Sequence, residues 1–371
     1  DGKGENIWDY EHRVNPSYFP NQSSTKEGAF FYENYEKDIL DKLNGEAENR
    51  FYLTSDFCRD FVGAEKLSKF DIRDADALLY MPGGYLGDRD DTSFYTTYLW
   101  LKRYFPIGLY YAAKRKPIMI LGVDAGPCKY AFMRMIIKKV CKSSYKVIVR
   151  NEDSKAFLVE KIGLSSDGVF VTSDYAQTIR DYPLPELPAL ESWKKPNKKT
   201  IMLHINENKT AREVIVPALE KFYNLHKGEY EIVVAGDQRY NNEGETYEAV
   251  RKFAGEDAYF HKYDDPMELC AVIKSCDFVI TYKLHVGIVA AAYSKSVIPI
   301  PQHYKKVEKY YRHIGHGDRV IPLKDATHEN VFEKMELYAD KQIVLSDEIY
   351  ARAKQNEAYI DEFIDYINRQ D

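Results

Sequence analysis

The chain has 371 residues, a formal net charge of −6 and a pI near 5.9. This acidic balance argues against a general nucleic-acid binder, and the length predicts two domains rather than one core. Its five cysteines are scattered and lack zinc spacing, which favours reduced thiols. With no apolar run near the ~18 residues of a membrane span and no signal peptide at the start, we expect a cytoplasmic protein.

Strands and helices alternate through the first half of the chain. A helix is expected at about 24–43 and another at 93–114. Strand-like apolar runs occupy 50–54, 75–81, 117–122, 146–150 and 168–172. This alternation predicts a parallel sheet.

Small residues follow two of these strands. The strand at 75–81 ends in Gly83 and Gly84, with Asp88 four residues on, and the strand at 117–122 ends in the turn 122–127. Adjacent glycines permit positive φ and close approach of the backbone to a ligand. A purely structural turn explains the same residues, and the sequence leaves both interpretations open.

A basic side chain, Arg150, closes the strand at 146–150. An arginine at a strand end is able to clamp a phosphate or carboxylate with its fork of donors. It is equally suited to pairing with Glu152, Asp153 or another structural acid. The residues do not decide between these uses.

Basic residues cluster between 129 and 155, on and around a helix whose apolar stripe is Met133, Ile136, Ile137 and Val140. One hypothesis is a peripheral contact with an anionic membrane surface that carries a lipid-linked substrate, which would place the protein at the inner face of the membrane. A solvated basic face is the alternative.

A proline-bearing stretch divides the chain. Four prolines fall in the fourteen residues 183–196, which indicates a linker. We therefore place an N-terminal domain at 1–185 and a C-terminal domain at 186–371. Strands then fit 200–205, 231–235, 258–260, 278–281 and 297–300, and a last helix at about 346–369 is a candidate to cross back onto the first domain. The predicted fold class is α/β, with two Rossmann-like domains whose parallel sheets face a cleft (glycosyltransferase-B-like).

The stretch 276–311 carries the most chemistry. Lys283 and His285 follow the strand at 278–281, and His303 and Lys306 follow the strand at 297–300. Ligands bind at the carboxyl ends of strands in open α/β sheets, and lysines beside a helix N-terminus favour an anion. The helix dipole opposes a charged His285 ring unless a bound anion offsets it, so this histidine is suited to acid–base work. A cap or core histidine is the alternative.

Several common motifs are absent from the sequence. It has no Gly-Lys-Ser/Thr phosphate loop, no Gly-x-Ser-x-Gly elbow and no Gly-x-Gly-x-x-Gly fingerprint. No His, Asp and Glu set has metal-ligand spacing. We expect neither a metal nor a cofactor.

The order of these motifs resembles the polysaccharide pyruvyl transferases. The matching pieces are Gly83-Gly84 with Asp88, Gly122 with Gly126-Pro127, Arg150 with Ser154, Lys283-Leu284-His285, and Lys306-Val307. Three positions depart from the family. Lys283 stands where arginine is usual, His303 where tyrosine is usual, and Asp174-Tyr175 where Asp-Pro is usual.

The resemblance implies a function and roles for the residues. Phosphoenolpyruvate would be the donor, with no cofactor, and a sugar or glycan the acceptor, giving a pyruvate ketal and phosphate. His285 would be the general acid and base. Lys283 and Lys306 would hold the donor's anionic groups, with Arg150, His303, Gly83, Gly84 and Asp88 as further substrate-binding candidates. The donor would bind the C-terminal domain and the acceptor the N-terminal domain.

Two other functions compete with this one. A nucleotide-sugar glycosyltransferase of the same architecture would use a similar basic site for a diphosphate, although no Glu-rich ribose motif follows Lys283. A non-catalytic carbohydrate-binding relative would keep the fold and lose the chemistry. Neither requires nucleic acid, and the oligomeric state is not predicted.

Overall fold

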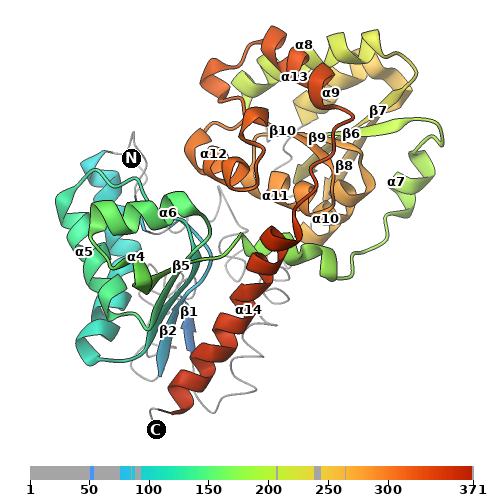
Figure 1. Ribbon diagram of the computed structural model, residues 1–371. Helices are drawn as coiled ribbons and strands as arrows, with labels where there is room; N and C mark the ends of the chain where they lie inside the picture. Colours follow the sequence, from blue (N-terminus) through green and yellow to red (C-terminus); the bar gives the residue numbers. More distant parts are fainter. Residues whose placement is uncertain are drawn as a thin grey trace, which may run out of the picture. The chain divides into compact units, whose positions relative to one another are not determined.

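The computed structural model describes residues 51–53, 76–84, 86–87, 93–205, 208–237, 244–263 and 265–369 (Figure 1). The helix expected at about 24–43 and the candidate residue Asp88 lie outside these ranges. The chain forms two compact units. Unit 1 combines Asp1–Tyr175 with Ala351–Asp371, and unit 2 is Ala176–Tyr350.

Unit 1 contains a five-stranded parallel sheet in chain order. Its strands are β1 (Phe51–Leu53), β2 (Ala77–Tyr80), β3 (Ile118–Val123), β4 (Lys146–Val149) and β5 (Val169–Val171). The described residues of unit 1 include the helices α4 (Phe94–Lys114), α5 (Ala131–Ser143), the short α6 (Glu152–Ala156), which continues into a π-helical turn (Phe157–Ile162), and most of α14 (Asp347–Asn368). The parallel sheet that the alternating pattern predicted is therefore confirmed.

Both faces of the unit 1 sheet are covered, as parallel sheets require. Alternate side chains of β2 point to opposite faces. Leu78 and Tyr80 pack in the core formed with α4 and α5. Ala77 and Leu79 pack instead with Ile360 and other apolar side chains of α14. The C-terminal helix is thus an integral layer of unit 1.

Unit 2 contains a second parallel sheet, in the order β10-β9-β6-β7-β8. The strands are β6 (Lys199–His204), β7 (Tyr230–Asp237), β8 (Ala258–Tyr263), β9 (Phe278–Thr281) and β10 (Ser296–Pro299). The chain starts in the middle at β6, moves outward to β8, and returns to β9 on the other side. This is a doubly wound, Rossmann-like order with its switch point between β6 and β9.

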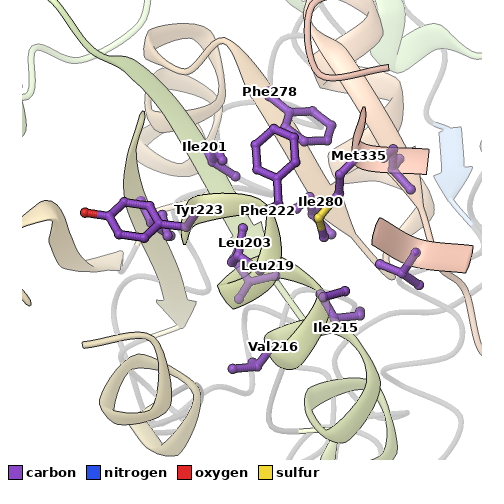
Figure 2. Packing of buried hydrophobic residues seen from close by; sticks show 14 of the residues in the cluster. Ile201, Leu203, Ile215, Val216, Leu219, Phe222, Tyr223, Phe278, Ile280 and Met335 are labelled. Carbon is purple, nitrogen blue, oxygen red and sulfur yellow. The ribbon is translucent and has the colours of Figure 1, made fainter. Parts of the chain in front are cut away.

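Helices cover the unit 2 sheet. They are α7 (Pro188–Trp193), α8 (Lys209–Leu225), α9 (Gly244–Ala254), α10 (Pro266–Ser275), α11 (Leu284–Ala292), α12 (Tyr304–His313) and α13 (His328–Tyr338). Figure 2 shows Leu203 of β6 packed with Phe222 of α8 and Met335 of α13 in one cluster. Helix α13 was not predicted. It begins with a capping box in which Thr327 and Asn330 satisfy each other's backbone N–H groups.

The proline-bearing segment differs from the predicted linker. The boundary between the units falls between Tyr175 and Ala176 rather than at about residue 185. The segment packs on unit 2, where Leu190 of α7 is fully buried and the Trp193 ring lies 5.0 Å from that of Tyr259. Pro188 occupies the start of α7, where a missing N–H costs no hydrogen bond, so its prolines do not imply an extended chain.

No helix in the described part of the chain has the length and apolar character that a membrane crossing requires.

Candidate functional site

Polar residues lie at the carboxyl ends of the unit 2 strands, along one edge of the sheet. β6 and β9 pair in parallel at the switch point, with His204 opposite Thr281. The N–H of Tyr282 donates to the carbonyl of His204 at 3.3 Å, so the strand ends stay joined where the chain turns away. Ligands of doubly wound folds bind at this edge.

The junction of β9 and α11 presents Lys283 and His285. Lys283 is the N-cap of α11, and its backbone N–H donates to Thr281 Oγ1 at 3.0 Å. Its side chain is half-buried, with Nζ 5.0 Å from the centroid of the Tyr282 ring. His285, in the first turn, is exposed. The charge and the imidazole therefore stand at the positive end of the helix.

The remainder of α11 holds this junction in place. Every residue from Val286 to Ala292 is buried. The helix packs so closely on α12 that a Cβ added to Gly287 would lie 2.4 Å from the hydroxyl oxygen of Tyr311. Small residues here let α11 sit tightly against its neighbour, which fixes the position of its N-terminus at the sheet edge.

The junction of β10 and α12 presents the second pair, His303 and Lys306. His303 is the N-cap of α12 and is exposed, whereas Lys306 is half-buried in the first turn. Pro299 of β10 lies opposite Thr281 of β9. Neighbouring strands are about 4.8 Å apart, so the N-termini of α11 and α12 emerge side by side. Two lysines and two helix N-termini make this edge electropositive.

A third junction contacts the second. Asn208 is the N-cap of α8, and its side chain accepts a hydrogen bond from the Ala211 N–H. Its Nδ2 also donates to Gln302 Oε1 at 3.4 Å, which joins the turn after β6 to the turn after β10. Together with the β6–β9 pairing, this contact places the three junctions along one edge.

His204, at the end of β6, is a buried polar residue of this edge. Its Nε2 lies 3.1 Å from the hydroxyl of Tyr263, and its Nδ1 has no hydrogen-bond partner within the described ranges. Burial, and then the positive charge of Lys283, lower the pKa of His204 to about 3. The ring is therefore neutral at pH 7. His204 lies within the predicted strand at 200–205, and no role was predicted for it, although a histidine near the end of an apolar strand was the available signal.

The carboxyl edge of unit 1 brings its two glycine-bearing turns together. The N–H of Asp124 donates to the Gly83 carbonyl at 2.7 Å, and Leu86 forms a parallel bridge with Ala125. Gly126 has a φ of +69°, and a Cβ there would lie 2.5 Å from Cγ of Phe157, so no larger residue fits without a shift. Gly83 and Gly84 thus belong to a double turn at this edge.

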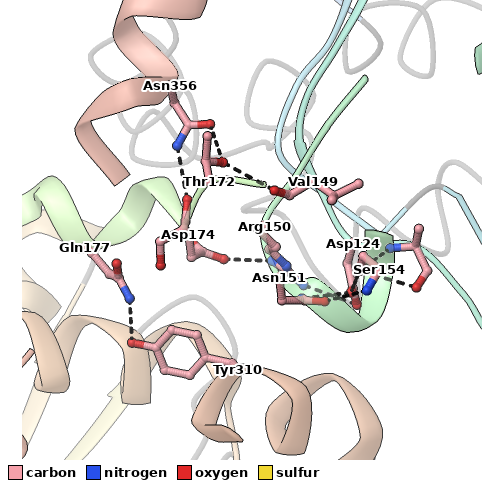
Figure 3. Close-up of polar contacts among 12 residues, drawn as sticks. Asp124, Val149, Arg150, Asn151, Ser154, Thr172, Asp174, Gln177, Tyr310 and Asn356 are labelled. Atoms are coloured by element: carbon pink, nitrogen blue, oxygen red, sulfur yellow. Dashed lines mark hydrogen bonds and ion pairs between the residues drawn. The ribbon is translucent and has the colours of Figure 1, made fainter. Parts of the chain in front are cut away.

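Arg150 is held in unit 1 by two buried acids (Figure 3). Its Nη1 donates to Asp174 Oδ2 at 2.8 Å, and its Nη2 lies 3.5 Å from Asp124 Oδ2. The side chain of Arg150 is 8% exposed. These are structural acids other than Glu152 and Asp153, and Glu152 faces Arg352 instead, at 3.4 Å. An anion that bound Arg150 would have to compete with two carboxylates.

Ser154 completes this cluster. Its hydroxyl donates to Asp124 Oδ1 at 2.8 Å and accepts from the Ala125 N–H at 2.9 Å. Asn151 caps α6 by accepting from the Ser154 N–H. The Arg-x-x-x-Ser spacing therefore serves to tie the end of β4 to the turn that follows β3.

Solved structures of low identity share the fold. A putative UDP-N-acetylglucosamine 2-epimerase from Listeria monocytogenes is 13% identical with a TM-score of 0.57, over 84% of this chain and 80% of that one. A UDP-GlcNAc 2-epimerase from Neisseria meningitidis, bound to UDP-GlcNAc, is 13% identical with a TM-score of 0.50, over 83% and 81%. These likenesses show the fold alone, and they confirm the predicted pair of parallel-sheet α/β domains of the glycosyltransferase-B-like class.

Sequence comparison gives the family. No curated protein matches the chain. The family model for polysaccharide pyruvyl transferase matches residues 7–304, a span that includes Lys283, His285 and His303 and ends before Lys306. This match covers most of the chain and agrees with the order of the motifs in the sequence. The chain belongs to the polysaccharide pyruvyl transferase family.

Proposed function

We propose that this protein transfers a pyruvyl group from phosphoenolpyruvate to two hydroxyls of a sugar in a glycan, forming a cyclic ketal and releasing phosphate. Family membership supports a transferase that acts on a polysaccharide, and the donor and the ketal are the proposal. The observation that carries it is the pair of adjacent helix N-termini, each with a lysine, beside the exposed imidazole of His285.

The donor's charges suit the carboxyl edge of unit 2. Phosphoenolpyruvate carries a phosphate group and a carboxylate on the same carbon, C2. Lys283 and Lys306 supply two cations from adjacent junctions, and the N-terminal N–H groups of α11 and α12 favour anions at the same place. His303, at the N-cap of α12, is a further donor. His204 is neutral at pH 7, so it adds no positive charge to this site.

The reaction balances without a cofactor. A proton added to the methylene carbon of phosphoenolpyruvate makes a methyl group and leaves an oxocarbenium-like centre at C2. The first sugar hydroxyl attacks C2 and loses its proton. The second hydroxyl then forms the other C–O bond as the C–O bond to phosphate breaks. Of the two protons that the hydroxyls release, one replaces the proton used at the methylene carbon and one leaves with phosphate.

His285 is assigned the proton transfers. Its exposed ring in the first turn of α11 is next to Lys283, which would hold the donor. The helix N-terminus disfavours a charged ring, whereas bound phosphate and carboxylate favour one. Donor binding would thus favour protonation of the His285 ring, which would then give this proton to the methylene carbon. Gly83 and Gly84 stay candidates for contacts with the acceptor.

The test is direct detection of both products. The purified protein is incubated with phosphoenolpyruvate and a panel of glycans, and we expect phosphate release together with a new ketal methyl signal in the NMR spectrum of the glycan. Phosphate release without a glycan methyl signal, or neither product with any acceptor, would refute the proposal.

A second measurement separates the donor classes. Thermal unfolding is followed with phosphoenolpyruvate or with UDP at equal concentration. A higher unfolding midpoint with phosphoenolpyruvate supports pyruvyl transfer. Stabilisation by UDP alone would identify the site as one for a nucleoside diphosphate and would favour a nucleotide-sugar glycosyltransferase.

A further inference from the structure

Unit 1 has an exposed apolar surface on the outer sides of α4 and α5. Phe94 and Tyr98 of α4 are 58% and 47% exposed, and Met135 of α5 is 72% exposed. Unit 2 contributes the other exposed large apolar side chains of the described ranges, namely Leu225, Leu337 and Val344. Among the described residues of unit 1, therefore, the exposed large apolar side chains lie on one pair of packed helices.

Ring contacts join the two helices into one surface. The Phe94 ring lies 5.5 Å from the rings of both Phe132 and Tyr130. Residues three or four apart on a helix share a face, which places Tyr98 beside Phe94 on α4 and Met135 beside Phe132 on α5. An apolar surface thus spans both helices near their N-termini.

This surface is not the stripe that the sequence suggested as membrane-facing. Met133, Ile137 and Val140 of that stripe are fully buried in the core of unit 1. These three side chains have no surface to offer a bilayer, so the membrane-facing prediction was wrong for them, whereas the fourth residue of the stripe, Ile136, is half-buried. The large apolar side chain that α5 exposes is the neighbouring Met135, and Phe132 beside it is half-buried.

The charge on these helices has one sign. Neither α4 nor α5 contains an acidic residue, in a protein whose net charge is −6. Their basic residues are Lys102, Arg103, Lys114, Arg134, Lys138, Lys139 and Lys142. The acidic residues at positions 88, 90 and 91, just before α4, lie outside the described ranges.

The basic groups continue the apolar surface along α5. Phe132, Met135, Lys139 and Lys142 follow one another at spacings of three and four residues, so they form one stripe that is apolar at its N-terminal end and basic at its C-terminal end. Lys139 and Lys142 are exposed. At the apolar end, Lys129 holds its Nζ 5.3 Å from the Tyr130 ring centroid.

We propose that this α4–α5 surface (Phe94, Tyr98, Phe132, Met135, Lys139 and Lys142) docks the protein on an anionic lipid bilayer. Aromatic and methionine side chains would enter the headgroup region, and the lysines would contact lipid phosphates. A glycan site would need hydrogen-bond acceptors as well as donors, whereas the charged groups of this surface are all cations.

The binding experiment uses the full chain without substrates. Protein is co-sedimented with vesicles of phosphatidylcholine alone, or with phosphatidylglycerol added, at low and high salt. We expect binding to the anionic vesicles that weakens as salt rises, since exposed charges are screened. Binding to neutral vesicles that equals binding to anionic ones, or no binding to either, would overturn the proposal.

Paired variants test the two halves of the surface. Lys139→Glu with Lys142→Glu should lower the affinity for anionic vesicles at least ~25-fold, about fivefold for each lysine. Phe94→Ser with Met135→Ser should lower it about tenfold. The controls change matched groups on unit 2, Lys227→Glu with Lys252→Glu and Leu225→Ser with Val344→Ser, all exposed. Controls that weaken binding as much would show that no specific surface is involved.

Two further readouts separate other occupants of the surface. If Phe94→Ser with Met135→Ser turns a dimer into a monomer in analytical ultracentrifugation and leaves vesicle binding unchanged, the surface joins two copies of the chain and the bilayer proposal fails. Phosphate release with a lipid-free acceptor should be unchanged in the same variant. Loss of vesicle binding with full turnover supports the docking role and leaves the proposed reaction intact.

Discussion

The imidazole of His204 and the hydroxyl of Tyr263 meet at 3.1 Å beneath the carboxyl edge of the unit 2 sheet. One closes the central strand β6 and the other closes the edge strand β8. Because the His204 ring is buried beside Lys283, the pKa of His204 falls from 6.5 to about 3. The charge of Lys283, which we assign to donor binding, thus adds to the acid sensitivity that the burial of His204 gives to unit 2.

The pH dependence of that coupling has a definite sign. Between about pH 6.5 and pH 3 the unfolded chain binds a proton at His204 that the folded chain excludes. Stability should therefore fall with decreasing pH, by up to about 1.4 kcal/mol per pH unit and by about 2 kcal/mol at pH 5. Urea unfolding at pH 7 and pH 5 measures this. When the pH falls from 7 to 5, the free energy of unfolding of His204→Gln should decrease less than that of the parent. The exposed His328→Gln should lose as much as the parent. If His204→Gln loses as much unfolding free energy between pH 7 and pH 5 as the parent, the acid sensitivity does not come from His204.

Lys283 provides the sharpest test of the donor site. Lys283→Ala should lower kcat/KM for phosphoenolpyruvate about 10²- to 10³-fold, because a charge aimed at the reacting phosphate is lost. Lys283→Arg should keep most of the activity, since arginine is usual at this position in the family. Lys305→Ala, which removes an exposed cation at the neighbouring junction, should have little effect. Equal losses for Lys305→Ala and Lys283→Ala would mean that only the overall charge matters.

His285→Ala separates proton transfer from binding. We expect kcat to fall about 10²- to 10⁴-fold, the usual contribution of a general acid or base. The shift of the thermal midpoint with phosphoenolpyruvate should persist, because the lysines remain. His328→Ala, an exposed histidine of α13, is the matched control. Full turnover by His285→Ala would remove the histidine from the mechanism.

We predict that Arg150 contributes mainly to the stability of the protein. Arg150→Ala leaves Asp124 and Asp174 without their buried cation, a change that commonly costs about 3–5 kcal/mol. Arg150→Lys should recover part of this, although it loses the two-pronged geometry. The midpoint of thermal unfolding is the measurement. A variant with parental stability and a raised KM for phosphoenolpyruvate would show that Arg150 serves the substrate instead.

The sequence predicted the fold well where its signals were local. The strand at 278–281 has the predicted bounds, because an apolar run there stops at a polar cluster. The same cluster gave Lys283 and His285 their place at the N-terminus of a helix. The catalytic and binding roles of Lys283 and His285 stay predictions. Sequence spacing locates the residues, but only measurement can establish what they do.

Other features depend on contacts that no local pattern reports. Prolines suggested a linker at 183–196, but Leu190 is buried in unit 2. The helix with Met133, Ile137 and Val140 was interpreted either as membrane-facing or as a solvated basic face, but these three side chains are buried in the core of unit 1. The partners of Arg150 were left open, because Asp124 and Asp174 are 26 and 24 residues away in the sequence.

Asn356 of α14 accepts from the Thr172 hydroxyl at 3.0 Å and donates to the Ser173 carbonyl at 3.1 Å, and it is 1% exposed. It therefore fastens the C-terminal helix to the end of β5. During synthesis on the ribosome, unit 2 emerges as one continuous piece, whereas the unit 1 side chains that pack on α14, such as Ala77 and Leu79, gain those contacts only after residue 351 has emerged. Truncation before residue 351 should thus strip the apolar face of unit 1 and leave it prone to aggregate, while unit 2 keeps all of its own layers.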